Sequence, residues 1–394
     1  MCARVKYSNE DTTRGIRGIL TDLSMAILII ANSIAWIIPI SGYNLVFVMA
    51  LSGVLFLIGD GLKFFNTKPF IIIIPSLLLF VLSILFRTGP DEYLNKYLLE
   101  FIALGITSLF MAFGRFNPIR VLKIICYISI PMLIYVKGID MYGGVRVDYG
   151  FWMGISYGIV KYIVALVLLI FFTKEFPMII RLALLFVFAL YMIFYLEFSS
   201  RGALLAVVFS IGLFWIVRQD YTLTKTGIIS IAILIFGYFY IMSIFEILYT
   251  YLQSIGIESS ALHKLLYLND ITNGREDIAV SAYELFLNSP IWGNGIASYE
   301  ELYDRYVHNC FIQFLDEGGI LYLLLMTYFI AKSFIILFDK KISQSQRYFM
   351  AFLISCGLIQ LLFSSYFWGA QCFWLMIGYS MKITHKKTHF VFHK

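Results

Sequence analysis

The chain has 394 residues, of which 60% are hydrophobic and only 14% are charged, and its mean hydropathy is +0.84. Soluble domains carry roughly 25% charged residues, so the composition excludes a soluble globular protein. The formal net charge of +6 would suggest nucleic acid as a partner of a soluble protein. Here the placement of the basic residues between apolar segments explains the charge, and no nucleic-acid partner is expected.

Apolar segments begin close to the N-terminus and recur along almost the whole chain. The polar and basic start is followed by an apolar run at 22–40, which is too long for a cleaved signal and predicts an uncleaved first helix. Runs of about 17 to 21 apolar residues are long enough to cross a bilayer core of ~30 Å as helices. The predicted spans are 22–40, 43–62, 69–86, 97–114, 119–136, 154–173, 178–197, 202–217, 226–245, 310–338, 347–364 and 366–383.

This pattern predicts an all-α fold, a polytopic transmembrane helical bundle of about 12 spans. The run at 310–338 is too long for one ordinary span, so we expect its start to tilt or to lie at the membrane interface. Three regions follow from the map. They are an N-terminal membrane bundle (1–245, nine spans), a long outer loop with an amphipathic helix (246–309), and C-terminal spans with a basic tail (310–394).

The basic residues give the expected orientation. With the N-terminus in the cytoplasm, most Lys and Arg fall in short inner loops and tails, as the positive-inside rule requires of an even number of spans. The outer side holds only Arg87, Lys96, Lys137, Arg146, Arg201, Lys264, Arg275 and Arg305. We therefore expect both termini to be cytoplasmic.

Neither cysteines nor histidines indicate a metal site. The five cysteines form no CxxC pair, so neither a disulfide framework nor a zinc site is expected. The tail "HKKTHFVFHK" contains His385, His389 and His393, and it fits a basic cytoplasmic anchor better than a ligand set. No metal and no cofactor is expected.

Arg201 stands at the start of the predicted eighth span, in "SSRGALLA". A guanidinium is costly to desolvate, so its presence at the mouth of an apolar helix requires a reason. The orientation above places it on the outer side of the membrane. It either snorkels to the interface and marks the helix end, or it binds an anion together with other outer residues.

The long outer loop holds a second arginine at the start of a predicted helix. Asn273 and Glu276 have the spacing of a capping box, and Asn288-Ser289-Pro290 ends the helix. Ile278, Ala282, Leu285 and Phe286 give this helix one apolar face. Arg275 lies in its first turn, where it either pairs with a neighbouring carboxylate in solvent or joins the helix N-terminus in binding an anion.

The loop ends in "YVHNCFIQFLDEGGILY", which places His308 and Asn309 just before the chain re-enters the membrane. A histidine here is either structural or a proton acceptor, since its pKa lies near neutrality. Gly318-Gly319 predicts a bend or close helix packing, and "GNG" at 293–295 predicts a tight turn. Two arginines on one membrane face suit a diphosphate, and a nearby histidine suits deprotonation of a hydroxyl.

At these residues the sequence resembles the O-antigen ligase and O-antigen polymerase family of bacterial envelope enzymes. The matching pieces are "SSRGALLA" (199–206), "GRE…SPIWGNG" (274–295) and "HNCFIQFLDEGGILY" (308–322). The last contains His-Asn, nine residues, then Gly319, two residues and Tyr322. The resemblance covers about residues 150–365, whereas the first spans match only in being hydrophobic.

The resemblance implies a metal-independent glycosyltransferase of the lipid-sugar-dependent (GT-C-like) type in the bacterial cytoplasmic (inner) membrane. It would take a glycan from an undecaprenyl-diphosphate-linked oligosaccharide at the outer face and move it to a sugar hydroxyl. Arg201 and Arg275 would bind the diphosphate and His308 would be the base, supported by Asn309, Gly319 and Tyr322. The compact "SPIWGNG" turn favours a polymerase of O-antigen, capsule or exopolysaccharide repeats over a ligase to lipid A core, and a chain-length regulator protein would be a possible partner.

A flippase or transporter of lipid-linked sugars is the alternative from another class. Asp60, Lys161, Glu197 and Lys332 are ionisable residues within the predicted spans, and such residues are functional by default. However, no inverted repeat is evident, and a transporter gives no reason to collect Arg201, Arg275 and His308 on one face. A purely structural or sensor membrane protein explains still less.

Overall fold

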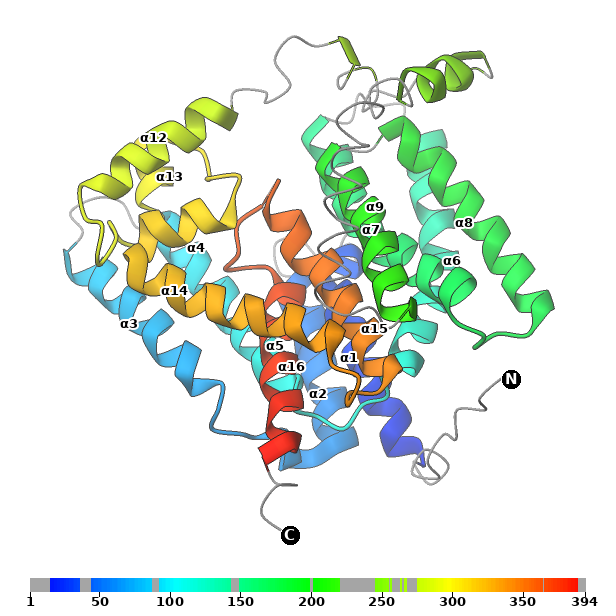
Figure 1. Cartoon of the computed structure of the whole chain (residues 1–394), viewed down its shortest axis with the longest axis horizontal. Helices are drawn as coiled ribbons and strands as arrows, with labels where there is room; N and C mark the ends of the chain where they lie inside the picture. The colour runs from blue at the N-terminus through cyan, green and yellow to red at the C-terminus, as the bar shows by residue number, and fades with distance from the viewer. Residues whose placement is uncertain are drawn as a thin grey trace.

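A computed structural model describes residues 15–35, 44–86, 92–142, 149–198, 201–219, 245–254, 256, 263, 266–267, 275–363 and 365–388. Within these residues every regular element is a helix (Figure 1), which confirms the all-α prediction. The α-helices are α1 (Ile16–Ala35), α2 (Asn44–Asp60), α3 (Phe70–Phe86), α4 (Glu92–Glu100), α5 (Thr107–Met111), α6 (Pro118–Tyr142), α7 (Tyr149–Val167), α8 (Met178–Phe198), α9 (Arg201–Gln219), α12 (Arg275–Leu287), α13 (Ser298–Tyr303), α14 (Cys310–Phe338), α15 (Gln344–Leu353) and α16 (Gln371–Thr388).

The described residues also form short helical segments that are wound more widely or more tightly than an α-helix. Three π-helices interrupt or extend the α-helices: η3 (Phe101–Ile106) joins α4 to α5, η4 (Leu168–Phe172) extends α7, and η5 (Ile354–Ile359) extends α15. A 3-10 turn, η2 (Gly61–Phe64), follows α2. Segments with π geometry often mark functional sites, and η5 lines a cavity.

Seven helices in the described part of the chain are long and apolar enough to cross a membrane, so the chain is a multi-pass helical membrane protein. They are Ile16–Ala35, Glu92–Met111, Pro118–Val136, Gly154–Phe172, Met178–Tyr195, Gly202–Gln219 and Cys310–Phe338. Phe47–Asp60 and Phe70–Leu85 are shorter apolar helices. The predicted span at 226–245 lies outside the described residues, and the predicted spans at 347–364 and 366–383 correspond to α15 with η5 and to α16, which are not among the seven.

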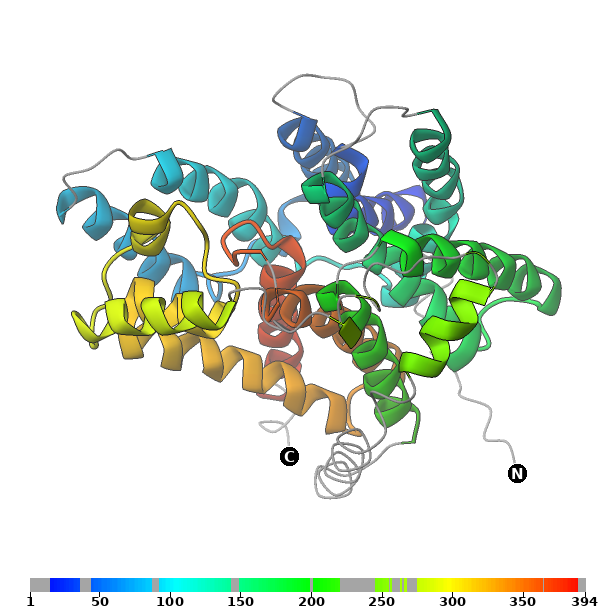
Figure 2. The ribbon, with the colours of Figure 1, turned by 90° about the horizontal axis from the view of Figure 1, so that it is seen from above.

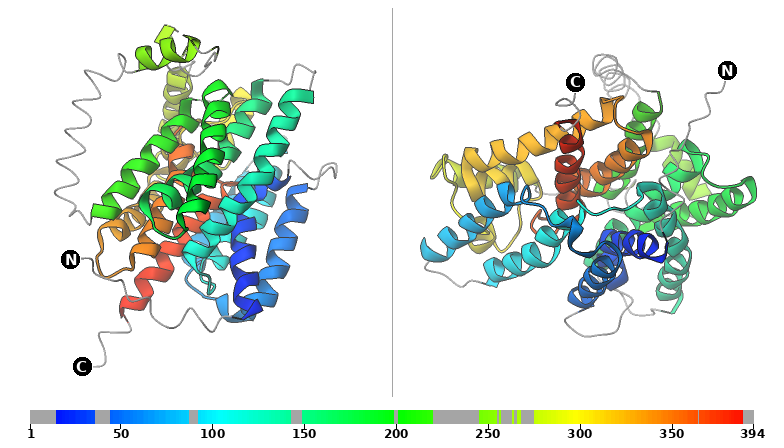
Figure 3. Two further views of the ribbon diagram at one scale, coloured as in Figure 1. Left: turned by 90° about the vertical axis from the view of Figure 1, so that its right-hand side faces the viewer. Right: turned by 90° about the horizontal axis from the view of Figure 1, so that it is seen from below.

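The helices are arranged around α16. Seen from above, α16 lies centrally, with α12 to α14 on one side and α6 to α9 on the other (Figure 2). Most of the long helices run in a common direction (Figure 3), whereas α14 runs across them (Figure 1). Where α16 begins, Trp368 and Trp374 pack with Phe101 and Phe367 at ring separations between 4.3 and 6.1 Å. This fully buried aromatic group holds the centre of the bundle together.

Two basic side chains from predicted inner loops have described partners near helix ends. Arg218, in the last turn of α9, donates to the carbonyl of Phe171 at 3.2 Å, and Arg120 forms an ion pair with Asp22 at 3.1 Å. The first turn of α1 and the last turn of α16 lie at the same end of the bundle (Figure 1).

The first helix begins earlier than predicted, at Ile16 rather than near residue 22, because Asp22 has partners inside the bundle. Its fully buried carboxylate accepts the backbone N–H of Asn117 at 2.6 Å as well as the Arg120 pair. Together these contacts tie α1 to the start of α6, so the polar first turns of α1 are retained as helix.

Replacing Asp22 by alanine is expected to lower the free energy of unfolding by about 2–3 kcal/mol, because it leaves a buried N–H and a guanidinium without their acceptor. Thermal unfolding of the detergent-solubilised protein measures the change. Glu175→Ala is the control: its pair with Lys123 at 2.7 Å is partly exposed, and its loss should cost less than about 1 kcal/mol. Equal shifts in the two variants would contradict the assigned role of Asp22.

Candidate functional site

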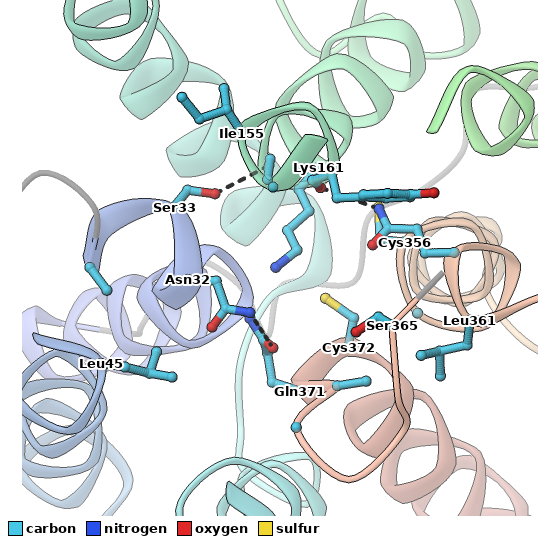
Figure 4. Close-up of a pocket in the computed structure, with 18 of the residues that line it drawn as sticks. Asn32, Ser33, Leu45, Ile155, Lys161, Cys356, Leu361, Ser365, Gln371 and Cys372 are labelled. Carbon is cyan, nitrogen blue, oxygen red and sulfur yellow. Dashed lines mark hydrogen bonds between the residues drawn. The ribbon is translucent and has the colours of Figure 1, made fainter. Parts of the chain in front are cut away.

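A cavity of about 420 Å³ opens between α1, α7, η5 and the start of α16 (Figure 4). This volume lies within the range of small-molecule sites. Amide, hydroxyl, thiol and aromatic side chains line it together with one lysine. The lining includes Asn32, Tyr157, Lys161, Gln360 and Gln371. The backbone of η5 contributes Cys356 and Gly357 to the wall, so the π-helical segment belongs to the site.

Lys161 points into this cavity from α7 (Figure 4) although only 5% of it is exposed. Gln371 lies beside it, and in one orientation of the Gln371 amide its oxygen accepts from the Asn32 amide nitrogen at 3.4 Å. With the Gln371 amide turned so that its oxygen faces Lys161, the ammonium donates to it at 2.9 Å and the amide nitrogen donates to the carbonyl of Gly369 at 3.2 Å. We favour that orientation because a buried ammonium requires an acceptor.

His308 reaches the same cavity through its neighbour Tyr306. The His308 and Tyr306 rings are in tilted contact with centroids 4.3 Å apart, and Tyr306 packs edge-on against Tyr366 at 6.2 Å. Tyr306 and Tyr366 both line the cavity. The Tyr366 hydroxyl donates to Glu100 at 2.8 Å, so this wall of the cavity is hydrogen-bonded to a carboxylate behind it.

Arg201 is the first residue of α9, and its side chain is outside the described residues. The next residue, Gly202, shows where this helix begins relative to the cavity. A Cβ on Gly202 would lie 2.5 Å from the Tyr157 hydroxyl and 2.6 Å from the Cβ of Phe363, and Tyr157 lines the cavity. The glycine therefore allows the start of α9 to pack directly on the cavity wall, and it places the backbone of Arg201 there.

Arg275 is the first residue of α12, the amphipathic helix predicted for the outer loop, and its side chain is also outside the described residues. One turn further on, Ile278 packs with Ala282, Tyr299 and Val307 in a small apolar cluster. Val307 is the residue before His308. The start of α12 is therefore packed on the segment that carries His308.

The three residues predicted to support the site have structural contacts. Asn309 is the N-cap of α14, and its side-chain oxygen accepts the N–H groups of Phe311 and Ile312 at 2.9 and 3.4 Å. Tyr322 is buried and shares a hydrogen bond of 3.0 Å with Ser76. Gly319 forms the kink described next. They position the His308 segment and are not among the cavity-lining residues.

Gly319 has φ +66° and ψ −167°, which breaks α14 into two helical parts. The break frees the carbonyls of Asp316 and Glu317, which accept the N–H groups of Asn294 and Gly295 at 2.7 and 3.1 Å. The bend predicted at Gly318-Gly319 and the tight turn predicted at 293–295 are both confirmed, and the structure adds that each is built against the other.

Sequence analysis missed a group of buried carboxylates close to this turn. Asp316 accepts from Asn294 and Ser298 at 3.0 and 2.9 Å, and Glu317 accepts from Trp368 and Gln313 at 2.7 and 2.9 Å. Glu300 accepts from the Tyr97 hydroxyl at 2.7 Å. The sequence signal was the occurrence of acidic residues in an otherwise apolar stretch. In the described part of the chain no group of three His, Cys, Asp or Glu residues could hold a metal ion.

The other ionisable residues of the predicted spans differ from Lys161. Asp60 accepts the backbone N–H of Arg115 at 3.3 Å, and the Lys332 ammonium lies 4.5 Å from the centre of the Tyr328 ring. The side chain of Glu197 lies outside the described residues. Of the three that are described, Lys161 alone faces the cavity.

No protein-family model matches the chain, and no curated protein matches it either.

Proposed function

We propose that this protein is an integral-membrane glycosyltransferase that moves a glycan from undecaprenyl diphosphate to a sugar hydroxyl. The observation that supports the proposal best is that His308 contacts Tyr306, which lines a cavity against whose wall α9 begins with Arg201. Arg275 begins the helix packed on the His308 segment. Two arginines and a histidine acting together would suit a reaction in which a diphosphate leaves and a hydroxyl attacks.

In the proposed reaction the acceptor hydroxyl oxygen attacks the anomeric carbon of the donor glycan. The bond from that carbon to the diphosphate oxygen breaks, and the hydroxyl proton passes to His308. Arg201 and Arg275 bind the diphosphate and stabilise the charge that develops on it as it leaves. Undecaprenyl diphosphate and the lengthened glycan are the products, and the arginines supply fixed positive charge that does not depend on pH.

We propose polymerisation of O-antigen, capsule or exopolysaccharide repeats as the specific reaction. The compact turn at 289–295 and the segment that begins at His308 support this through their resemblance to polymerases. An O-antigen ligase would perform the same chemistry with lipid A core as its acceptor. The proposal also assigns about 12 spans, a GT-C-like architecture, cytoplasmic termini and an outward-facing site in the bacterial cytoplasmic membrane.

A lipid-linked oligosaccharide flippase is the second candidate, and one observation favours it. Lys161 lies seven residues after Gly154, where the candidate membrane span of α7 begins, so it is about 10 Å into that span at a rise of ~1.5 Å per residue. The residue therefore lies within the bilayer core, and transporters bind their substrates near its midplane. The contact of His308 with the lining residue Tyr306, and the packing of the start of α9 on the cavity wall, are better explained by transfer than by transport.

Deleting the gene in its host and separating the surface glycans on a gel distinguishes the candidates. Loss of a polymerase leaves a single repeat unit attached to its carrier. Loss of a ligase leaves long chains that are not attached to lipid A core, and loss of a flippase leaves unpolymerised repeats inside the cell. Only the first pattern supports the specific reaction proposed here.

Complementing the deletion with Arg201→Ala is expected to reduce polymer formation about 10²–10³-fold, the effect of removing one group that stabilises a developing negative charge. Arg201→Lys should restore part of the activity, because a lysine keeps the charge and loses the bidentate geometry. Arg218→Ala, at the other end of α9, is the matched control. Wild-type glycans from Arg201→Ala at normal protein level would refute the role of Arg201.

A further inference from the structure

The cavity has an unusual charge composition. Among the described residues that line it, Lys161 is the one charged side chain, and none is Asp or Glu. The described hydrogen-bond partner of its ammonium is the neutral amide of Gln371. A buried ammonium without a carboxylate partner is costly in a membrane bundle, so stability does not account for Lys161.

The other lining groups suit a sugar. Asn32, Gln360 and Gln371 each carry both donor and acceptor atoms, as the hydroxyls of a sugar require. Tyr157, Tyr306 and Tyr366 add ring surface and hydroxyls to the same walls. A bare phosphate cluster would call for many donors and several cations, whereas this lining mixes donors with acceptors.

We propose that the cavity binds one sugar unit that carries a carboxylate, such as a uronic acid, and that Lys161 is its counter-ion. The charges balance: one carboxylate matches one ammonium, whereas a diphosphate would leave negative charge uncompensated in this cavity. The volume of about 420 Å³ accommodates a monosaccharide unit. The assignment rests on the proposed glycosyltransferase function and specifies its substrate as an acidic glycan.

The location fits a specificity role beside the transfer site. Tyr306 lines the cavity that holds Lys161, and its ring contacts His308 with centroids 4.3 Å apart, so a single residue connects the proposed sugar site to the proposed base. The anionic parts of the substrate would then be bound separately, with the diphosphate at Arg201 and Arg275 and the sugar carboxylate at Lys161. Lys161 is therefore assigned as a binding residue and not as a catalytic one.

The test measures binding to the purified full-length chain in lipid nanodiscs by saturation-transfer NMR. The probes are D-glucuronate and D-glucose, which differ only at C6, with inorganic pyrophosphate as competitor. We expect glucuronate to bind at least about tenfold more tightly than glucose, the effect of one charge-assisted hydrogen bond. Lys161→Met should abolish that preference, whereas Lys332→Met, a span lysine that packs on Tyr328 outside the cavity, should retain it.

Thermal unfolding without ligand provides a second measurement. Because methionine has a similar length and no charge, Lys161→Met should unfold at the same or a higher temperature than the wild type. If Lys161→Met does not fold, Lys161→Gln replaces it in the binding test, and a Gln variant that also fails to fold would contradict the view that Lys161 is kept for binding.

Three results would overturn the inference: equal affinity for the two sugars, a preference that survives Lys161→Met, or displacement of glucuronate by equimolar pyrophosphate that depends on Lys161. The last result would assign the site to phosphate. These outcomes are independent of the gene-deletion experiment, because binding is measured without transfer. Normal polymer in the deletion strain would refute the transferase, and absence of a glucuronate preference would refute only the acidic-sugar site.

Discussion

Replacing His308 by alanine is expected to reduce glycan transfer by about 10²–10⁴-fold, the range associated with loss of a general base. The acceptor hydroxyl would then have no group to receive its proton while the new glycosidic bond forms. Transfer is measured in membranes from the complemented deletion strain, with a lipid-linked repeat as donor. Replacing His263, which packs on Tyr249 and Tyr267 in a separate cluster, provides the control and should leave the rate unchanged.

A second variant separates the chemical role of His308 from a structural one. The His308 ring packs against Tyr306, and His308→Phe retains an aromatic ring at that position while removing the proton acceptor. We expect His308→Phe to be as inactive as His308→Ala and to unfold at the wild-type temperature. A phenylalanine variant that transfers glycan normally would show that the site requires the contact between the two rings and does not require proton transfer to His308.

Replacing Gly319 by alanine is expected to lower the free energy of unfolding by at least about 3 kcal/mol and to reduce the yield of folded protein. Its φ of +66° with ψ of −167° is a conformation essentially restricted to glycine. An added Cβ would lie 2.2 Å from the carbonyl oxygen of Ile291, so the turn at 289–297 would have to move away from α14. Unfolding of the solubilised variant by heat measures the loss.

The control for this prediction is another glycine-to-alanine change. Gly53 lies within α2, and a Cβ there would meet nothing within 4 Å. Gly53→Ala should therefore stabilise the protein slightly, because alanine has the higher helix propensity. If Gly319→Ala were as stable as Gly53→Ala, the kink of α14 at the positive φ of Gly319 would not be needed for the fold.

The sequence predicted much of the fold because helices in membranes depend on local patterns. The amphipathic positions at Ile278 and Ala282 identified α12, and Gly318-Gly319 identified a bend. Each of these signals is contained within a few neighbouring residues. The start of α1 was wrong by several residues because it depends on Asp22 meeting Asn117, which lies 95 residues away. No local pattern contains that contact.

The same distinction applies to the site. The sequence marked Arg201, His308 and Lys161 by their chemistry, but it gave no reason to place Lys161 beside Gln371, far along the chain. It also missed Glu300 and Glu317, whose donors Tyr97 and Trp368 come from distant segments. A cavity is formed by packing between helices, and its lining becomes visible only when those helices are placed.

The interlock between the 293–295 turn and α14 also determines how a bulky substrate can enter. Two hydrogen bonds join the turn to the carbonyls exposed by the kink, and a third joins Ile320 to Pro290. We therefore expect the segment from α12 to His308 to move with α14 as one body, and it cannot act as a hinged flap. Any opening that admits a lipid-linked chain to the proposed site would then have to form between helices outside this segment.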